Sequence, residues 1–274
     1  MPAQRSLLSV FTTGFSLARK ANLFRMSGFR RAFVSSYFLY KRFYEDPFLA
    51  LIDQKPELFR NGDILDIGAN IGYTSCLFSK PLRPESKIYA FEPDLFNFDL
   101  LQEVIRRKNL SRTVVPIQAA VGACDGNVEF WHNDRHHGDH RVVTTQFRNF
   151  RPDPARISVV PVVTIDNFVE SRGVHTISFI KIDVQGYELA VCEGMKQTLA
   201  RFPGAVIAFE YAPDALIELG FDPTMLLDFF ERRGYLIHGV SPPSVECLSD
   251  RSMINELAAK RGYIDLLCLR RKLV

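Results

Sequence analysis

The sequence predicts an α/β protein in which helices cover both faces of an open, mostly parallel sheet. From residue 62 onward, short apolar runs alternate with longer segments of helical periodicity, which is the pattern of repeated βαβ units. Turn and capping residues separate these segments. The chain has 274 residues, 47% of them apolar and 24% charged, which indicates a globular protein of one large or two small domains and excludes a disordered or fibrous chain.

Seven apolar runs are predicted as strands and four amphipathic segments as helices. Asp222 and Pro223 supply an N-cap and a proline at the first helical position, and Gly234 stands where that helix should end. Pro93 and Asp94 open another helix in a similar way. The predicted strands are 63–69, 87–91, 114–121, 177–184, 205–211, 235–240 and 263–270. The predicted helices are 72–80, 94–108, 186–200 and 222–233.

The segment 122–176 interrupts this alternation, because it is much longer than one crossover helix requires. It contains predicted strands at 128–131 and 157–163, a histidine-rich stretch between them, and a predicted helix at 165–171. Insertions at the carboxyl edge of an open α/β sheet commonly shape a ligand site. We therefore expect this segment to lie on the substrate side of the molecule.

The N-terminal segment differs in composition from the rest, so we divide the chain into a helical extension over 1–55 and a sheet domain over 56–274. Residues 1–43 contain eight Arg and Lys and no acidic residue. Their Phe and Leu residues favour helices packed on the main domain or on a second subunit, and the alternative is a basic surface that contacts anionic lipid. The net charge of the whole chain, +3, is too small to indicate a nucleic-acid partner.

The cysteines and the hydropathy pattern bear on the cellular compartment. The five cysteines, at positions 76, 124, 192, 247 and 268, are widely spaced and form no C-x-x-C pair, which is typical of a reduced cytoplasmic protein. No apolar run approaches roughly 18 residues, so the sequence predicts no membrane span.

The most informative residues, Asp66 to Gly72, come at the end of the first predicted strand and read D-I-G-A-N-I-G. Glycines at such a turn allow positive φ and let a ligand approach bare backbone, and the following helix would point its first amides at a carboxylate or phosphate. Glu92 ends the second predicted strand, where an acidic side chain can accept hydrogen bonds from ribose hydroxyls. The pattern indicates a nucleoside-containing cofactor rather than a tight turn alone.

Two details favour S-adenosyl-L-methionine over a nicotinamide dinucleotide. Asn70 stands where the dinucleotide pattern G-x-G-x-x-G has its second glycine, a bare position that a pyrophosphate needs and an amino-acid carboxylate does not. Asp66 lies two residues before Gly68, from where its carboxylate could reach the ammonium group of a methionine moiety. A nicotinamide-dependent oxidoreductase is therefore the less favoured alternative.

Four segments match motifs of a known family in the right order: ILDIGANIGYTS (64–75), IYAFEPD (88–94), VVTIDNF (162–168) and IKIDVQGYE (180–188). Through them, residues 55–240 resemble the FkbM-type methyltransferases, which are class I, S-adenosylmethionine-dependent enzymes that often act on hydroxyls of sugars or polyketides. The resemblance implies a Rossmann-like, doubly wound sheet of seven strands whose last strand, 263–270, is antiparallel and lies beside 235–240. The family more often has Glu where this chain has Gln185.

Methyl transfer to a hydroxyl needs a group that takes up the hydroxyl proton. Asp183 and Glu210 end the fourth and fifth predicted strands, so both should face the same crevice as Gly68 and Glu92. Asp183 is the favoured base, and its alternative role is to bind the cofactor. His140 is the next candidate base, because imidazole titrates near neutrality. We expect the cofactor to contact Asp66, Gly68, Ala69, Asn70, Gly72, Ser75, Glu92, Pro93, Ala119, Ala120 and Asp183.

The histidine-rich stretch also offers possible metal ligands, namely His132, His136, His137 and His140 with Asp134 and Asp139. We nevertheless predict that no metal takes part and that turnover survives chelation, because Asp183 has no second carboxylate beside it. The sequence thus predicts a cytoplasmic O-methyltransferase that uses S-adenosyl-L-methionine to methylate a hydroxyl of a small-molecule or carbohydrate acceptor. A non-catalytic S-adenosylmethionine-binding module is a further alternative.

Overall fold

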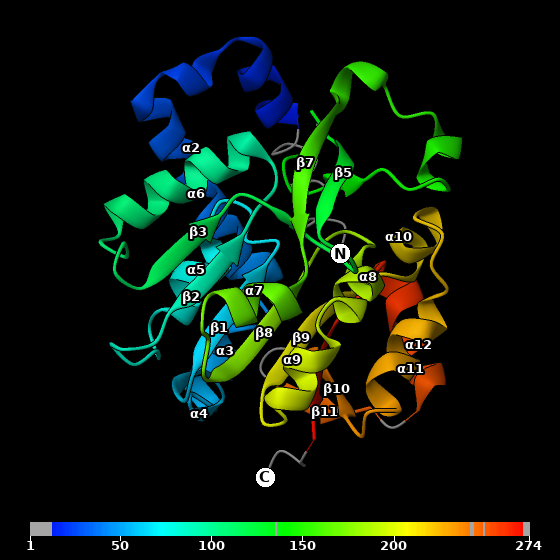
Figure 1. The fold of residues 1–274 in the computed structure, drawn as a ribbon. Coiled ribbons are helices and arrows are strands. Elements are labelled where there is room, and N and C mark those ends of the chain that lie inside the picture. Colours follow the sequence, from blue (N-terminus) through cyan, green and yellow to red (C-terminus); the bar gives the residue numbers. More distant parts are fainter. Residues whose placement is uncertain (1–12, 135, 242–243, 249, 271–274) are drawn as a thin grey trace.

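The computed structural model describes residues 13–134, 136–241, 244–248 and 250–270. Its centre is an eight-stranded sheet in the order β11-β10-β12-β9-β8-β1-β2-β3, and a four-stranded sheet in the order β4-β7-β5-β6 adjoins it (Figure 1). The strands of the large sheet are β1 (Asp63–Ile67), β2 (Ile88–Phe91), β3 (Val114–Ile117), β8 (Ile177–Ile182), β9 (Val206–Tyr211), β10 (Leu236–Ser241), β11 (Ser244–Cys247) and β12 (Ile264–Leu269). Those of the small sheet are β4 (Ala120–Val121), β5 (Gly126–Trp131), β6 (Arg141–Val142) and β7 (Ile157–Val163).

The predicted fold class is confirmed. β3, β2, β1, β8 and β9 are parallel, and β12 runs antiparallel between β9 and β10. The predicted strand 114–121 is wrong in one respect, because it divides between the two sheets. β2 is only four residues long and pairs with β3 over those four, after which the chain leaves the large sheet to form β4. The edge strand β11 was not predicted.

The helices follow the predicted order with one interruption. The predicted helix 186–200 is broken into α8 and α9 at Gly194, where an added Cβ would lie 2.0 Å from the carbonyl oxygen of Gly122. α10 and α12 were not predicted. The α-helices are α2 (Ser27–Tyr40), α3 (Leu49–Gln54), α4 (Glu57–Arg60), α5 (Tyr73–Phe78), α6 (Leu95–Arg107), α7 (Ile165–Ser171), α8 (Glu188–Glu193), α9 (Lys196–Arg201), α10 (Pro213–Glu218), α11 (Pro223–Glu231) and α12 (Arg251–Arg261).

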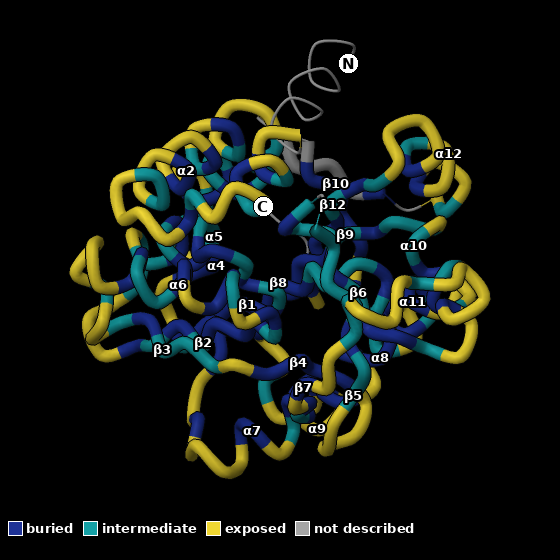
Figure 2. Tube along the Cα trace, turned by 90° about the horizontal axis from the view of Figure 1, so that it is seen from above, coloured by how far each residue is buried: buried dark blue, intermediate teal, exposed yellow. Residues whose placement is uncertain are grey.

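Two hydrophobic clusters cover the two faces of the large sheet. Ile64 of β1 and Phe179 of β8 pack against α3, α4, α5 and α6 on one face, whereas Leu65 and Ile180 face α7, α8, α9, α11 and α12 on the other. Figure 2 shows these central strands as buried and the loops around them as exposed. Burial on both faces explains why the central strands read as continuous apolar runs rather than alternating ones.

The described part of the N-terminal segment packs on the sheet domain. Phe15, Phe24 and Phe33 form an aromatic cluster that contacts Leu100 and other residues of α6. α2 lies beside α6 (Figure 1), and Arg30 Nε on α2 is 2.9 Å from the Glu103 carboxylate on α6. The cluster holds the basic N-terminal segment against α6.

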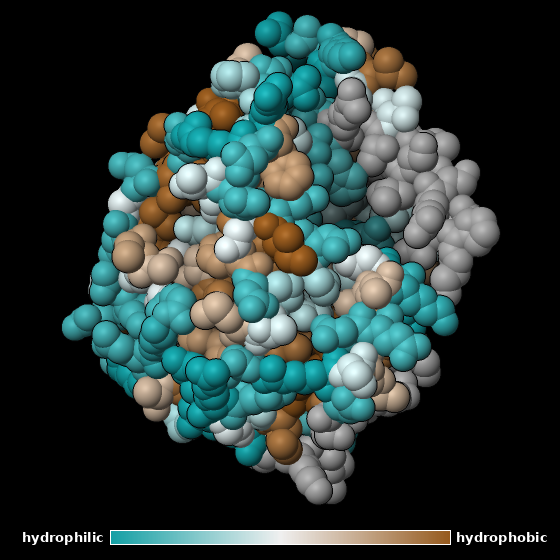
Figure 3. Space-filling view, turned by 90° about the vertical axis from the view of Figure 1, so that its right-hand side faces the viewer, coloured by the Kyte–Doolittle hydropathy of each residue, from teal (hydrophilic) through white to brown (hydrophobic). Residues whose placement is uncertain are grey.

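The surface of the molecule is mixed in character. Figure 3 shows hydrophilic and hydrophobic side chains interspersed on the side that lies to the right in Figure 1. Ile217 and Met225 on α10 and α11 are among the exposed apolar side chains. Among the described residues, no helix combines the length and apolar character that a membrane span requires.

Candidate active site

The loop that joins β1 to α5 lies directly against the end of β8. Gly68 in this loop has φ +79°, and an added Cβ would lie 1.9 Å from the carbonyl oxygen of Asp183. Gly72 has φ +89°, and its Cβ would lie 2.7 Å from the side chain of Leu101. Gly68 is therefore required by conformation and by space, whereas Gly72 is favoured by its positive φ, since the end of the Leu101 side chain can move aside.

The backbone amides of this loop are already engaged inside the protein. Those of residues 68–72 donate to the carbonyl oxygens of Phe91 and Ala69, to the side chain of Asn70 and to the carboxylate of Glu92, at 2.8–3.0 Å. These hydrogen bonds hold the loop in shape. The open donors expected from the sequence are the first amides of the following helix α5, which begins at Tyr73, and that expectation stays a prediction.

Glu92 lines the smaller of two adjoining cavities, which has a volume of about 70 Å³. Its carboxylate accepts hydrogen bonds from the backbone amides of Asn70 and Asp94, both at 2.9 Å. Burial, together with the nearby charge of Asp94, raises the pKa of Glu92 to about 8. The residues predicted to contact the cofactor that line this cavity are Gly68, Asn70, Glu92, Pro93, Ala119, Ala120 and Asp183.

Asp66 is fully buried beneath the loop and lines neither cavity. One carboxylate oxygen accepts hydrogen bonds from the hydroxyls of Ser75 at 2.6 Å and Thr74 at 2.8 Å. The other lies 3.6 Å from the Lys181 ammonium group. The carboxylate predicted to reach a methionine ammonium thus pairs with an ammonium of the protein itself. Gly72 and Ser75 also lie outside both cavities, whereas Ala69 lines the larger one.

Lys181 is a buried cation at the centre of the site that the sequence analysis did not single out. Its ammonium group donates to the carbonyl oxygen of Gly68 at 2.7 Å and lies 3.4 Å from the Asp183 carboxylate. Burial by itself would lower the pKa of Lys181, but the charges of Asp183 and Asp66 outweigh it and raise the pKa above its ordinary value. Lys181 therefore ties the glycine loop to the end of β8.

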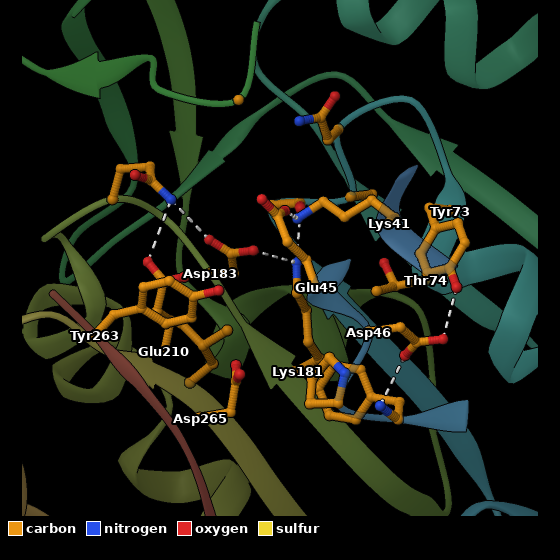
Figure 4. A pocket seen from close by; sticks show the side chains of 18 of the residues that line it. Lys41, Glu45, Asp46, Tyr73, Thr74, Lys181, Asp183, Glu210, Tyr263 and Asp265 are labelled. Carbon is orange, nitrogen blue, oxygen red and sulfur yellow. Dashed lines mark hydrogen bonds and ion pairs between the residues drawn. The ribbon is translucent and has the colours of Figure 1, made fainter. Parts of the chain in front are cut away.

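The larger cavity has a volume of about 250 Å³ and adjoins the smaller one. Gly68, Asn70, His137, Gly138, Asp183 and Gln185 line both. In Figure 4, Glu210, Tyr263 and Asp265 lie on one side of this cavity, Asp46 and Tyr73 lie on the other, and Asp183 lies between them. The structure thus brings the predicted residues Asp183 and Glu210 into one polar cavity.

The carboxylates of this cavity differ in the direction in which their pKa values are shifted. Gln185 donates to Asp183 at 3.0 Å and approaches Glu210 at 3.4 Å, and Asp265 is the cross-strand neighbour of Glu210. Burial would raise the pKa of Asp183, but nearby lysine ammonium groups outweigh it and hold the pKa below its ordinary value. Burial and the charge of Asp183 raise the pKa of Glu210 well above its ordinary range and that of Asp265 to about 7.

One wall of the larger cavity comes from the N-terminal segment. A π-helical turn, η2 (Lys41–Glu45), follows α2 and places the Lys41 ammonium 2.8 Å from the Glu45 carboxylate. Tyr40 donates to the same carboxylate at 2.6 Å. Beyond the turn, Asp46 accepts a hydrogen bond from the Tyr73 hydroxyl at 2.6 Å, which joins this wall to α5. Short π-helical segments are often found at functional sites.

His140 lies on the side of the smaller cavity and does not line the larger one. Its Nδ1 accepts a hydrogen bond from the Asn133 backbone amide at 2.9 Å, so the ring proton of the neutral form is on Nε2. Burial lowers the pKa of His140 to about 4, which keeps the ring neutral at pH 7. His136 and His137 are the histidines that line the larger cavity, where a base would have to take up the proton of the acceptor hydroxyl.

Asp94, His132 and His140 bring three possible metal-ligand atoms within 4.8 Å of one another. Contacts of the two histidines with the Asp94 carboxylate also explain why these three side chains lie together. His132 Nδ1 lies 2.6 Å from the Asp94 carboxylate and His140 Nε2 lies 3.7 Å from it. Burial would raise the pKa of Asp94, but the hydrogen bond from His132 and the nearby histidines lower it to about 2. Because His140 Nε2 carries the ring proton, its lone pair is not available to a metal in this arrangement.

Several site residues were missed because the sequence carries little sign of them. Lys181 and Asp265 are polar residues inside apolar strand runs, which is a usable signal for a buried functional group. Lys41 and Glu45 lie in a helical segment where charged residues are common, so nothing in their pattern separates them from a solvated surface.

Comparison with known proteins agrees with this arrangement. The family profile described as "Methyltransferase FkbM domain" matches residues 66–237. The hexuronic acid methyltransferase AglP of Haloferax volcanii is 30% identical over 139 residues, which are 50% of this chain and 52% of that protein. The chain thus matches about half the length of that relative. The methyltransferase sdnD of Sordaria araneosa is 23% identical over 73% of this chain and 87% of its own length.

Solved structures of methyltransferases are also similar to this chain. An FkbM methyltransferase of Methylobacillus flagellatus has a TM-score of 0.46 and 17% identity, covering 76% of this chain and 43% of its own. An O-methyltransferase of Bacillus cereus in complex with SAH has a TM-score of 0.46 and 13% identity, covering 81% of this chain and 79% of its own. The match of the family profile to more than half of the chain confirms the resemblance seen in the sequence motifs: the chain belongs to the FkbM methyltransferase domain family.

Proposed function

We propose that this protein is an S-adenosylmethionine-dependent O-methyltransferase that methylates a hydroxyl of a sugar or a similar polyol. The observation that carries the proposal is the junction of the two cavities. The smaller cavity, which contains Glu92, meets the larger polar cavity at Gly68 and Asp183. A donor with its nucleoside in the first cavity would present its methyl group to an acceptor in the second. The relative named as a hexuronic acid methyltransferase supports a sugar acceptor.

The smaller cavity offers the groups that a nucleoside needs. Two backbone amides use about half of the acceptor positions on the Glu92 carboxylate, so the remainder can accept from ribose hydroxyls. Pro93, Ala119 and Ala120 add apolar surface for a flat base. When bound, S-adenosylmethionine supplies an electrophilic methyl group on a sulfonium. The chain has to hold that group in line with the acceptor oxygen and exclude water.

Asp183 is the group best placed to take the proton of the acceptor hydroxyl. Of the carboxylates that line the larger cavity, Asp183 also lines the smaller one, so it lies closest to the position of transfer. Position takes precedence over pKa in choosing a general base. The lowered pKa of Asp183 keeps it ionised at neutral pH, and Gln185 and Lys181 fix its orientation.

At pH 9, above the pKa of Glu92, replacing Glu92 by alanine should weaken binding of S-adenosylhomocysteine by roughly 2–4 kcal/mol, because one or two charge-assisted hydrogen bonds are lost. Isothermal titration calorimetry on the folded variant measures this loss. The matched control is Glu85→Ala, since Glu85 is exposed in the loop before β2 and should leave affinity unchanged. Equal affinity in the Glu92 variant and the wild type would remove Glu92 from the donor site.

Replacing Asp183 by asparagine should reduce kcat by about 10²–10⁴ while the affinity for S-adenosylhomocysteine stays within a few fold. The reason is that the amide retains the shape of the carboxylate but cannot accept the hydroxyl proton. Turnover with a labelled donor and calorimetry separate the two quantities, with Asp214→Asn on the exposed side of α10 as control. Loss of donor affinity in place of turnover would assign Asp183 to donor binding instead.

A further inference from the structure

Part of the lining of the larger cavity comes from residues outside the family match. The match covers 66–237. The lining residues beyond it include Tyr37, Tyr40, Lys41, Glu45, Tyr263 and Asp265. These side chains come from α2, from the π-helical turn and from the start of β12, none of which belongs to the shared motifs. The acceptor preference of a relative therefore cannot be read from those motifs, and the cavity itself has to supply it.

This cavity has more carboxylates than cations. Its lining contains five carboxylates, Glu45, Asp46, Asp183, Glu210 and Asp265. Its two lysines both have carboxylate partners. Lys41 lies 2.8 Å from Glu45, and Lys181 lies 3.4 Å from Asp183. The histidines at 136 and 137 add no positive charge near neutral pH, since burial lowers the pKa of both.

The side of the cavity formed by β9 and β12 offers carboxyl groups whose pKa values are raised by burial and by the charge of Asp183, so their negative charge is reduced at neutral pH. Glu210 and Asp265 are cross-strand neighbours there, and no cation within ion-pair distance accompanies either among the described residues. Asp46 is satisfied differently, because it accepts from the Tyr73 hydroxyl and from the backbone amides that begin α3.

We propose that the acceptor is an uncharged polyol, such as a neutral sugar ring, and that the cavity disfavours uronic acids and sugar phosphates because both lysines of its described lining already have carboxylate partners. The inference rests on the proposed function and defines its acceptor. Hydroxyl groups can donate to Glu210, Asp265 and Glu45 and can accept from Lys41, and tyrosine rings offer faces for the apolar side of a sugar. An anionic acceptor would meet the same carboxylates, and the described lining has no lysine without a carboxylate partner.

The test compares matched glycosides that differ only at carbon 6. Phenyl glucoside, galactoside and mannoside are assayed with a radiolabelled donor beside the corresponding uronides. We expect kcat/KM for at least one neutral glycoside to exceed that of its uronide by about tenfold or more, because the carboxylate of a uronide would lose its hydration in the cavity without gaining a free cation as partner. A uronide used as well as its neutral counterpart would overturn the inference, and so would a panel in which no neutral glycoside is methylated.

Two further measurements distinguish a wrong acceptor class from a failure of the proposed function and from a folding defect. Calorimetry with S-adenosylhomocysteine runs on the same preparation, and failure to bind would contradict the methyltransferase proposal rather than the acceptor class. Glu45→Gln removes the carboxylate partner of Lys41 and should raise the ratio of uronide to neutral turnover by about tenfold. Asp53→Asn, on the exposed face of α3, should leave that ratio unchanged. An unchanged ratio in the Glu45 variant would also count against the inference.

Discussion

Replacing Gly68 by alanine should abolish binding of the methyl donor, with the affinity for S-adenosylhomocysteine falling by at least about 100-fold. The added Cβ would lie 1.9 Å from the carbonyl oxygen of Asp183, and that oxygen belongs to backbone that cannot rotate away. The loop would have to move from the end of β8, which separates Asn70 from the Glu92 carboxylate. Calorimetry measures the loss, and circular dichroism reports whether the sheet persists.

The matched control for this variant is Gly204→Ala. Gly204 has no atom within 4 Å of an added Cβ, so alanine fits there without displacing anything. We expect this variant to bind the donor analogue as the wild type does. Wild-type affinity in the Gly68 variant would show that the loop does not need its close contact with β8 and would contradict the geometry described for the site.

Replacing Lys181 by methionine should destabilise the fold by roughly 3–5 kcal/mol, because Asp66 and Asp183 would keep their charges without the cation between them. For a chain of this size, that loss lowers the melting temperature by on the order of 10 °C. Differential scanning calorimetry at constant pH measures it. Lys196→Met is the control, since Lys196 is exposed on α9 and its surface ion pair contributes little.

A double-mutant cycle tests whether the charge pair is the cause. In the variant that combines Asp66→Asn with Lys181→Met, one carboxylate charge is removed together with the cation. The combined loss of stability should therefore be smaller than the sum of the two single losses by about 1 kcal/mol or more. Strictly additive losses would mean that Lys181 does not stabilise the fold through its charge pair with Asp66.

Much of the fold could be predicted from the sequence because the signals are local. The apolar runs of β1 and β8 are buried on both faces, and the capped helices α6 and α11 begin at Asp94 and Asp222 as predicted. The errors arose where a distant contact decides the structure. Helix α8 ends where Gly194 meets Gly122, a residue far away in the sequence. The run 114–121 changes sheets because its partner strand is short, which no local pattern reveals.

The same distinction applies to the site. Gly68, Glu92 and Asp183 could be predicted because each follows a strand, and the carboxyl ends of parallel strands share one edge of the sheet. Asp66 stands in the same motif, but a buried lysine one strand away determines its partner. Lys41 and Glu45 enter the site only because an aromatic cluster seats α2 on α6, a tertiary contact that composition does not specify.

Methyl transfer from S-adenosylmethionine to a hydroxyl oxygen can be followed with an isotopically labelled donor. The full chain is incubated with a donor that carries a trideuterated methyl group and with the panel of glycosides, and the products are analysed by mass spectrometry before and after mild alkaline treatment. We predict a product that gains one trideuterated methyl group and keeps it in alkali, as an ether does. No labelled product, or a label that alkali releases as from an ester, would contradict the account.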